Sequence, residues 1–327
     1  MFFLVPLALL IMMISAVVLR HKISEVFSDY QDFYDKYKDL DSGKFLQKAN
    51  ERSARLTNYG VYFLMACIVS NVILIIGSFI YSIFEFGYAN IEILYRPFKF
   101  ELPWNQNCLL GWIGEGIFSI LVLCVGIFLT VLFFVLFISF LFFNLAFYQI
   151  YRLQFEKIDL MPQSTPFRNY IVKKLLLDSI LYHISAKKLF KKTARLYGSF
   201  ILIFLVSTIT FLALAIVQMD LALRHLDMSF LLMFEGFVHG LVELYAYCYV
   251  GKYSTDYFLA YADCLYQANW LTFSIELMRL FPFMIAHAQV PLYYHGSNMV
   301  VLSLELFLKM MKLVLSYYLM FKTLVDN

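Results

Sequence analysis

Six segments of this 327-residue chain are long and apolar enough to cross a lipid bilayer, which constrains its fold more than any motif does. A membrane-spanning helix needs about 20 apolar residues, because each residue rises about 1.5 Å through a hydrocarbon core about 30 Å thick. The segments are Phe2–Leu19, Tyr59–Phe84, Leu109–Ala146, Leu196–Met219, Met228–Val250 and Met299–Phe321. The third is too long for one crossing, so we expect it to tilt or to continue as a helix beyond the membrane.

The composition supports lipid as the solvent. Apolar residues make up 62% of the chain and charged residues 15%, whereas soluble domains carry about 25% charged residues. A soluble protein of this length could not bury so much apolar surface in one core. The net charge of +3 is too small to indicate nucleic-acid binding. The sequence therefore predicts an all-α, polytopic membrane protein with six transmembrane helices.

Basic residues in the connecting loops predict the orientation. Loops 20–58 and 147–195 contain eight and ten Lys or Arg residues, whereas loops 85–108 and 220–227 contain two and one. Cytoplasmic loops carry an excess of Lys and Arg. We therefore expect the first two loops in the cytosol, and both Met1 and the C-terminus outside the cell.

The cytosolic loops themselves have helical patterns. Val26, Tyr30 and Phe33 recur at helical spacing before a break at residues 41–43. Similar stripes follow in residues 167–195 and 251–279. We expect these extensions to pack beneath the bilayer as a helical domain. The alternative is that they lie on the anionic membrane surface.

Prolines interrupt another apolar stretch near the C-terminus. Pro282 and Pro291 divide residues 280–304, and proline breaks helices unless its neighbours compensate. The pattern predicts a short helix at Leu277–Ala288, then a turn, then the last span.

No enzyme motif is present in the sequence, and we predict neither catalytic residues nor cofactors. The five cysteines form no C-x-x-C pair and are interpreted as packing residues. Glu235, His239 and Glu243 share one helix face in the fifth span. A metal site is one interpretation. The favoured one is a polar stripe that faces a water-filled cavity or a neighbouring helix, so no metal ligand is predicted.

The last span divides into a polar half and an apolar half. Glu305, Lys309 and Lys312 lie at helical spacing in the first half, and residues 313–321 are apolar. Such a helix suits a pore with a polar vestibule and an apolar gate. A helix that simply protrudes from the membrane explains the pattern equally well.

Large apolar residues mix with small ones in the outer halves of the spans. An aromatic cavity of this kind would hold small apolar molecules. The alternative is ordinary helix packing. The candidates are Phe79, Trp112, Met233 and Phe234.

Short elements of the C-terminal third resemble the insect odorant receptor family in order and spacing. They are Tyr247-Cys248-Tyr249-Val250-Gly251, Asn269-Trp270, Ala288-Gln289-Val290-Pro291-Leu292, Leu302-Ser303-Leu304-Glu305-Leu306-Phe307 and Ser316-Tyr317-Tyr318. The segment Gly251-Lys252-Tyr253 departs from the Gly-Asn-Glu that is usual in that family.

The resemblance implies seven helices with a cytosolic N-terminus, so that Phe2–Leu19 corresponds to the second helix and the first is absent. It implies tetramers with a shared co-receptor, in which the last helix lines a cation pore. The apolar gate then falls on Met320, with Leu324 one turn outward and Thr323 beside it. Odorants bind among helices two, three, four and six, which by region again indicates Phe79, Trp112, Met233 and Phe234.

On this basis the chain is interpreted as an odorant receptor subunit in the plasma membrane of olfactory dendrites. It would bind small volatile hydrophobic ligands and gate a non-selective cation channel in a heterotetramer with the co-receptor. Residues 1–250 would form the ligand-binding bundle, and residues 251–327 the cytosolic anchor segment and the pore helix. One alternative is a gustatory receptor, although Ser316-Tyr317-x5-Thr323-Leu324 lacks the Gln-Phe of those proteins. Another is a secondary transporter, for which only Glu235–Glu243 is an indication.

Overall fold

The computed structural model of the chain describes residues 4–37, 43–86, 94, 108–162, 167–225, 229–297 and 299–326. Nearly all of this part is helical, which confirms the predicted all-α class. The α-helices are α1 (Leu4–Tyr37), α2 (Gly43–Phe86), α3 (Leu109–Asp159), α4 (Arg168–His225), α5 (Ser229–Gln267), α6 (Ile275–Ala288) and α7 (Leu304–Asp326). The short elements are the 3-10 helix η1 (Trp270–Thr272) and a hairpin of β1 (His295–Gly296) and β2 (Val300–Val301).

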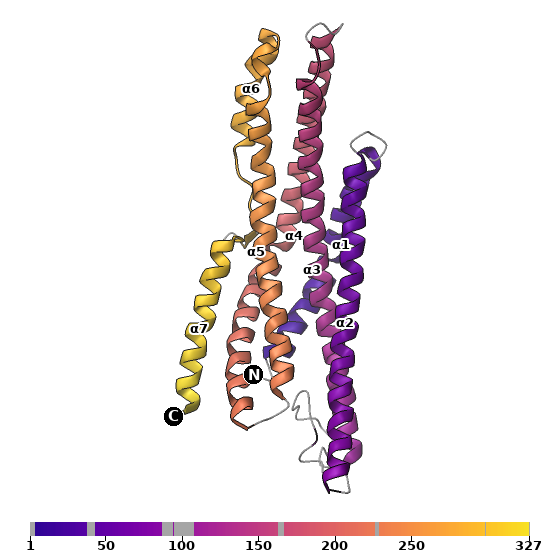
Figure 1. Ribbon diagram of the computed structural model, residues 1–327, viewed down its shortest axis with the longest axis vertical. Helices are drawn as coiled ribbons and strands as arrows, with labels where there is room; N and C mark the ends of the chain where they lie inside the picture. Colours follow the sequence, from indigo (N-terminus) through magenta and orange to yellow (C-terminus); the bar gives the residue numbers. More distant parts are fainter. Residues whose placement is uncertain are drawn as a thin grey trace.

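The helices form one elongated bundle in which α2, α3, α4 and α5 run alternately down and up (Figure 1). The short α6 lies beside the upper end of α5, and α7 runs down beside the lower half of the bundle. The start of α1 and the end of α7 lie toward the same lower end. That both ends of the chain face one side of the membrane stays a prediction.

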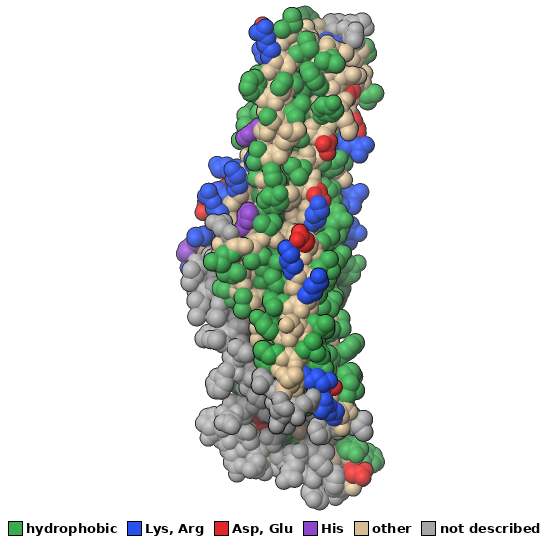
Figure 2. Space-filling view, turned by 90° about the vertical axis from the view of Figure 1, so that its left-hand side faces the viewer, with side chains coloured by type: hydrophobic (Ala, Val, Ile, Leu, Met, Phe, Trp, Pro, Cys, Tyr) green, Lys and Arg blue, Asp and Glu red, His purple; other side chains and the backbone are tan. Residues whose placement is uncertain are grey.

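The predicted spans lie within helices that continue well past them. The third apolar segment extends to Asp159 as α3, as expected. In the described part of the chain, α2, α3 and residues 200–224 of α4 are long and apolar enough to cross a membrane. The spans in α1, α5 and α7 stay predictions. Hydrophobic side chains cover much of the surface in Figure 2, and most of the Lys and Arg side chains visible there lie in its upper half.

The last helix begins later than predicted. The span was placed from Met299, but α7 starts at Leu304, and Val300 and Val301 instead pair with β1 as a strand. β-branched residues favour extended backbone. Ser303 then supplies the N-cap, since its hydroxyl accepts a hydrogen bond from the backbone N–H of Leu306 at 3.1 Å. The short helix predicted at Leu277–Ala288 is confirmed as α6, which begins two residues earlier.

The extensions beyond the spans pack against one another and do not lie flat on a surface. Tyr30 and Phe33 of α1 are buried. The ring of Phe33 lies 4.7 Å from that of Phe147 in α3 and 4.9 Å from that of Tyr182 in α4. Edge-on aromatic contacts of this kind stabilise a core beyond the area they bury. The expected helical domain is therefore present.

Residues 289–303, of which 298 is not described, connect α6 to α7 and are here called the strap. The Thr255 hydroxyl of α5 donates a hydrogen bond to the Leu292 carbonyl at 2.6 Å. The Ser297 N–H donates to the Gly198 carbonyl of α4 at 3.0 Å. Tyr294 is fully buried, with its ring 4.5 Å from that of Phe190. The strap is therefore bound to both α4 and α5 just before α7 begins.

Gly251 allows the strap to approach α5 closely. A Cβ atom at this position would lie 2.6 Å from the carbonyl oxygen of Leu302, and closer still to the Leu302 Cβ. Both neighbours are parts that cannot rotate away. The glycine of the Tyr-Cys-x-x-Gly element is therefore required by packing.

Replacing Gly251 with Ala should destabilise the protein by about 1–3 kcal/mol, since overpacking forces the backbone to shift. Thermal unfolding of the detergent-purified protein measures this. The matched control is Gly77→Ala in α2, where an added Cβ meets no atom within 4 Å. An equal effect of the two substitutions would contradict the packing role of Gly251.

His183 of α4 is buried in the helical domain and stacks on Tyr261, with ring centroids 4.2 Å apart. Neither ring nitrogen has a hydrogen-bond partner among the described residues. Burial, with smaller contributions from the positive charges of Lys187 and His287, lowers the pKa of His183 to about 4. The imidazole is therefore neutral in the folded protein at neutral pH.

Because the pKa of His183 is lower in the folded than in the unfolded state, acid favours unfolding. We expect this histidine to cost about 3 kcal/mol of stability as the pH falls from about 6.5 to about 4, and nothing above that range. His183→Phe keeps the ring and should remove this part of the pH dependence. Thermal unfolding at pH 7.5 and 5.0 tests it, and an unchanged difference between the two pH values in the variant would refute the assignment.

Candidate functional site

Two of the predicted ligand-binding residues meet between α2 and α3. Phe79 and Trp112 stack with ring centroids 5.9 Å apart and planes 16° from parallel. Trp112 is buried and Phe79 half-buried. Both residues lie near the ends of their predicted spans that are expected to face outside, where the sequence analysis placed the ligand-binding candidates. The stack supplies a flat apolar wall.

Buried polar side chains continue from this stack along both helices. Ser82 lies three residues after Phe79, and Glu115 and Ser119 follow Trp112 at helical spacing. All three are almost completely buried. Ionisable and polar groups at membrane depth are costly and mark functional positions. The α2–α3 interface therefore combines aromatic walls with a polar stripe.

The other two predicted ligand-binding residues lie elsewhere on the surface of α5. Met233 is half-buried, and Phe234 is 50% exposed and stacks on Phe230 with centroids 6.0 Å apart. The structure therefore brings Phe79 and Trp112 together, and it places Phe234 in a separate aromatic pair.

The predicted polar stripe of α5 faces a neighbouring helix. The hydroxyl of Ser70 in α2 donates a hydrogen bond to Glu235 Oε2 at 3.2 Å. One turn on, the His239 ring stacks on that of Phe63 in α2, 5.0 Å away, and its Nε2 lies 3.7 Å from Glu243 Oε2. Ser70 and Phe63 were not predicted as part of this site. The only sequence signal for Ser70 is a polar residue, followed by Asn71, in an apolar span.

This α2–α5 contact offers hydrogen-bond acceptors within apolar surroundings. Glu243 is buried, and its Oε1 has no hydrogen-bond partner in the described part of the chain. Within the same residues, no group of three or more His, Cys, Asp or Glu side chains could hold a metal ion. The arrangement can orient a small molecule that carries a hydroxyl or amino group.

The predicted gate residues lie near the end of α7. Met320 is 47% exposed, and the exposed Thr323 donates a hydrogen bond from its hydroxyl to the Met320 carbonyl at 2.7 Å. Leu324 lies within the helix, but its side chain is outside the described residues. In the first turns of α7, Glu305 and Lys309 form an ion pair at 2.7 Å.

One side of α7 packs on α4 and α5, and the other side is open. Leu306 and Val314 are buried against the bundle, whereas Leu308, Leu315 and Met320 are exposed. At the end of α7, Lys322 lies 3.4 Å from Asp220 of α4. The helix thus presents an apolar face that this single chain leaves uncovered.

Comparison with known proteins agrees with this geometry. The chain superimposes on the insect olfactory receptor OR5 from Machilis hrabei in complex with eugenol with a TM-score of 0.70 and 10% identity, over 98% of this chain and 79% of that one. For another structure of that receptor the TM-score is 0.68 and the identity 11%, over 97% and 78% of the two chains. At such identity the likeness establishes the fold alone. No curated protein sequence matches the chain significantly.

A family model provides the evolutionary assignment. The model described as 7tm Odorant receptor matches residues 1–315, which is nearly the whole chain. This is a family of membrane receptors and not of enzymes. The chain therefore belongs to the 7tm odorant receptor family.

Proposed function

We propose that this chain is the ligand-binding subunit of a ligand-gated, non-selective cation channel that it forms with a co-receptor in a heterotetramer. Its ligands are small, volatile and hydrophobic. The observation that carries the proposal is the strap, which is bound to α4 and α5 and leads directly into α7.

The ligand chamber lies among the membrane parts of α2, α3 and α5. Phe79 and Trp112 form an aromatic wall, and Ser70 and Glu235 provide polar atoms that fix orientation. Pockets for small molecules are mostly apolar with few polar groups. Met233 and Phe234 of α5 complete the proposed set of ligand contacts, because they lie in the outer half of the predicted span of α5. The related olfactory receptor from Machilis hrabei has been solved in complex with eugenol, a small aromatic molecule with one hydroxyl group.

The strap couples the ligand chamber to the pore, because it contacts α5 and continues directly into α7. A ligand changes a channel only through its differential affinity for the open and closed states. A ligand that favours one position of α5 also favours one position of Thr255 and Gly251. These residues hold the strap, so the start of α7 responds to the ligand.

The pore is formed by the open side of α7 from several subunits. Met320 is the apolar gate, with Thr323 beside it and Leu324 one turn outward. A ring of such side chains closes a channel by dewetting. The exposed Leu308, Leu315 and Met320 provide the apolar surface that an assembly would cover.

The proposed topology places the Lys- and Arg-rich ends of α1 and α4 in the cytosol and the C-terminus outside the cell. Residues 1–250 form the ligand-binding bundle, and residues 251–327 form the anchor segment and pore helix. The plasma membrane of olfactory dendrites is the proposed location.

Co-expression of the chain with a co-receptor, followed by recording of currents against an odorant panel, tests the function. We expect ligand-evoked cation current that persists when G-protein signalling is blocked. Trp112→Ala should lower the apparent affinity of an active ligand at least about tenfold, since an aromatic contact is lost. Trp270→Ala, far along the chain in η1, is the control. Silence across broad panels at normal surface expression would reject the proposal.

Substitution of the gate residue tests the pore separately. Met320→Ser should raise the current in the absence of ligand, because a polar ring no longer excludes water. Leu308→Ser, at a more exposed position in the first half of α7, should leave the basal current low. Identical basal currents in the two variants would place the gate elsewhere.

A further inference from the structure

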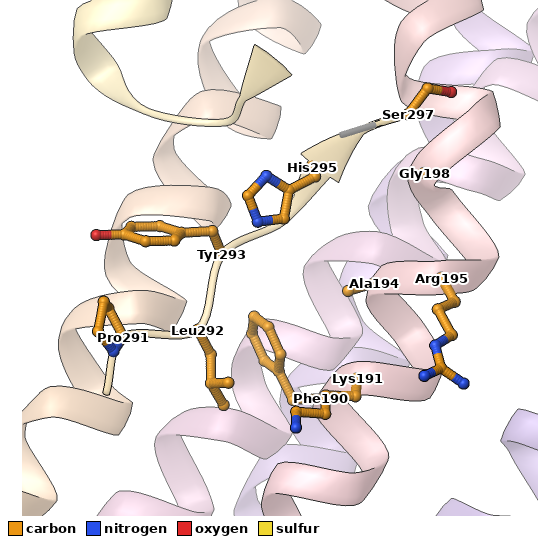
Figure 3. A pocket seen from close by; sticks show the side chains of 10 residues that line it. All are labelled: Phe190, Lys191, Ala194, Arg195, Gly198, Pro291, Leu292, Tyr293, His295 and Ser297. Carbon is orange, nitrogen blue, oxygen red and sulfur yellow. The ribbon is translucent and has the colours of Figure 1, made fainter. Parts of the chain in front are cut away.

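A cleft of about 480 Å³ lies between the strap and α4, away from the ligand chamber and the gate (Figure 3). One wall is the α4 face that carries Lys191, Arg195 and Gly198. The other is the strap, from Pro291 to Ser297. Figure 3 shows the strap leading from Pro291 to Ser297, which lies beside Gly198 of α4, with the ring of His295 to one side of that helix. The cleft therefore has walls from two different elements.

The cleft carries uncompensated positive charge. Lys191 and Arg195 are one helical turn apart, and in the described part of the chain neither forms an ion pair or a hydrogen bond. The neighbouring Lys192 differs, because it is paired with both Glu25 and Asp29 of α1. Among the described residues, no acidic side chain lines the cleft. The charge of Lys191, after burial, also lowers the pKa of nearby Lys187, as expected where cations crowd without a counter-ion.

Hydrogen-bond donors accompany the charges. The strap side of the cleft adds the His295 ring and the Ser297 side chain, whereas the hydroxyl of Tyr293 points away from α4 (Figure 3). A guanidinium group matches phosphate oxygens in a bidentate geometry, and an ammonium group binds them as a point charge. The set of groups therefore suits a phosphate better than a carboxylate, which has fewer acceptor oxygens.

The position of the cleft along α4 also indicates its depth relative to the proposed membrane. Arg195 is the last basic residue before the apolar stretch Leu196–Met219. In the proposed topology this is where α4 enters the inner leaflet, at the depth of lipid headgroups. Basic pockets at this depth are suited to phosphorylated headgroups.

We propose that this cleft binds a phosphate-bearing anion, supplied by the headgroup of a phosphorylated inner-leaflet lipid or by a soluble phosphate ester. The anion bridges Lys191 and Arg195 of α4 to the strap. Because the strap continues into α7, the bound anion holds the start of α7 against α4. This site is separate from the proposed odorant site and rests on the cleft and its charges, and its placement at headgroup depth rests on the proposed topology.

Native mass spectrometry of the detergent-purified full chain tests the site. The probes are dioctanoyl phosphatidylinositol 4,5-bisphosphate, dioctanoyl phosphatidylcholine and free inositol 1,4,5-trisphosphate. The test variant combines Lys191→Gln with Arg195→Gln. The control combines Lys173→Gln with Lys174→Gln, which removes the same charge from exposed positions of the same helix. Thermal unfolding confirms that both variants fold.

We expect the phosphorylated lipid to bind the native chain and the control alike, and the cleft variant at least about tenfold more weakly. Binding of the lipid without the free trisphosphate identifies a membrane source, and equal binding of both identifies a soluble one. Phosphatidylinositol bisphosphate that binds no better than phosphatidylcholine, or equally well to the cleft and control variants, would overturn the proposal.

Discussion

The need to satisfy every backbone hydrogen bond in lipid governs this structure. A chain that enters hydrocarbon has no water to bond with, so only helices or closed barrels can cross it. Here the longest helices continue without a break beyond their apolar spans, as α3 does from Leu109 to Asp159. The membrane crossing fixes the direction of each helix. The side-chain faces of these helices then determine how the helical domain packs. Irregular backbone occurs in the strap, where α4 and α5 supply the missing partners.

The strap shows how short sequence elements acquire a physical meaning. Gly251 is needed because Leu302 touches the backbone of α5, and the carbonyl of Leu292 accepts a hydrogen bond from Thr255. Tyr294 fills the space between α3 and α4 with its ring. These elements are distant in sequence but form one joint, which holds the start of α7 to α4 and α5. The same joint forms one wall of the basic cleft, so two different ligands would act on one connection.

Local patterns allowed the helices to be predicted, since the apolar runs and the stripe Val26, Tyr30 and Phe33 follow the helical period. The predicted start of α7 was wrong. Val300 and Val301 pair with β1, and this pairing depends on the fold of the strap, which local sequence patterns do not predict. Among the candidate ligand residues, Phe79 and Trp112 meet, whereas Phe234 stacks on Phe230. Residues in one region of a bundle need not share an interface, because each helix turns its faces by 100° per residue. Ser70 could not be predicted as a site residue, because its contact with Glu235 depends on how α2 packs beside α5.

The unbroken course of α5 makes it a lever arm. Glu235 and Thr255 lie 20 residues apart in one helix, which corresponds to ~30 Å at about 1.5 Å per residue. A tilt of about 5° around the Glu235 end would displace Thr255 by ~2.5 Å by the same helical geometry. That displacement is as large as the 2.6 Å hydrogen bond that joins Thr255 to the strap. A small tilt at the Glu235 end of α5 is thus magnified at the Thr255 end into a displacement that this joint must either follow or break.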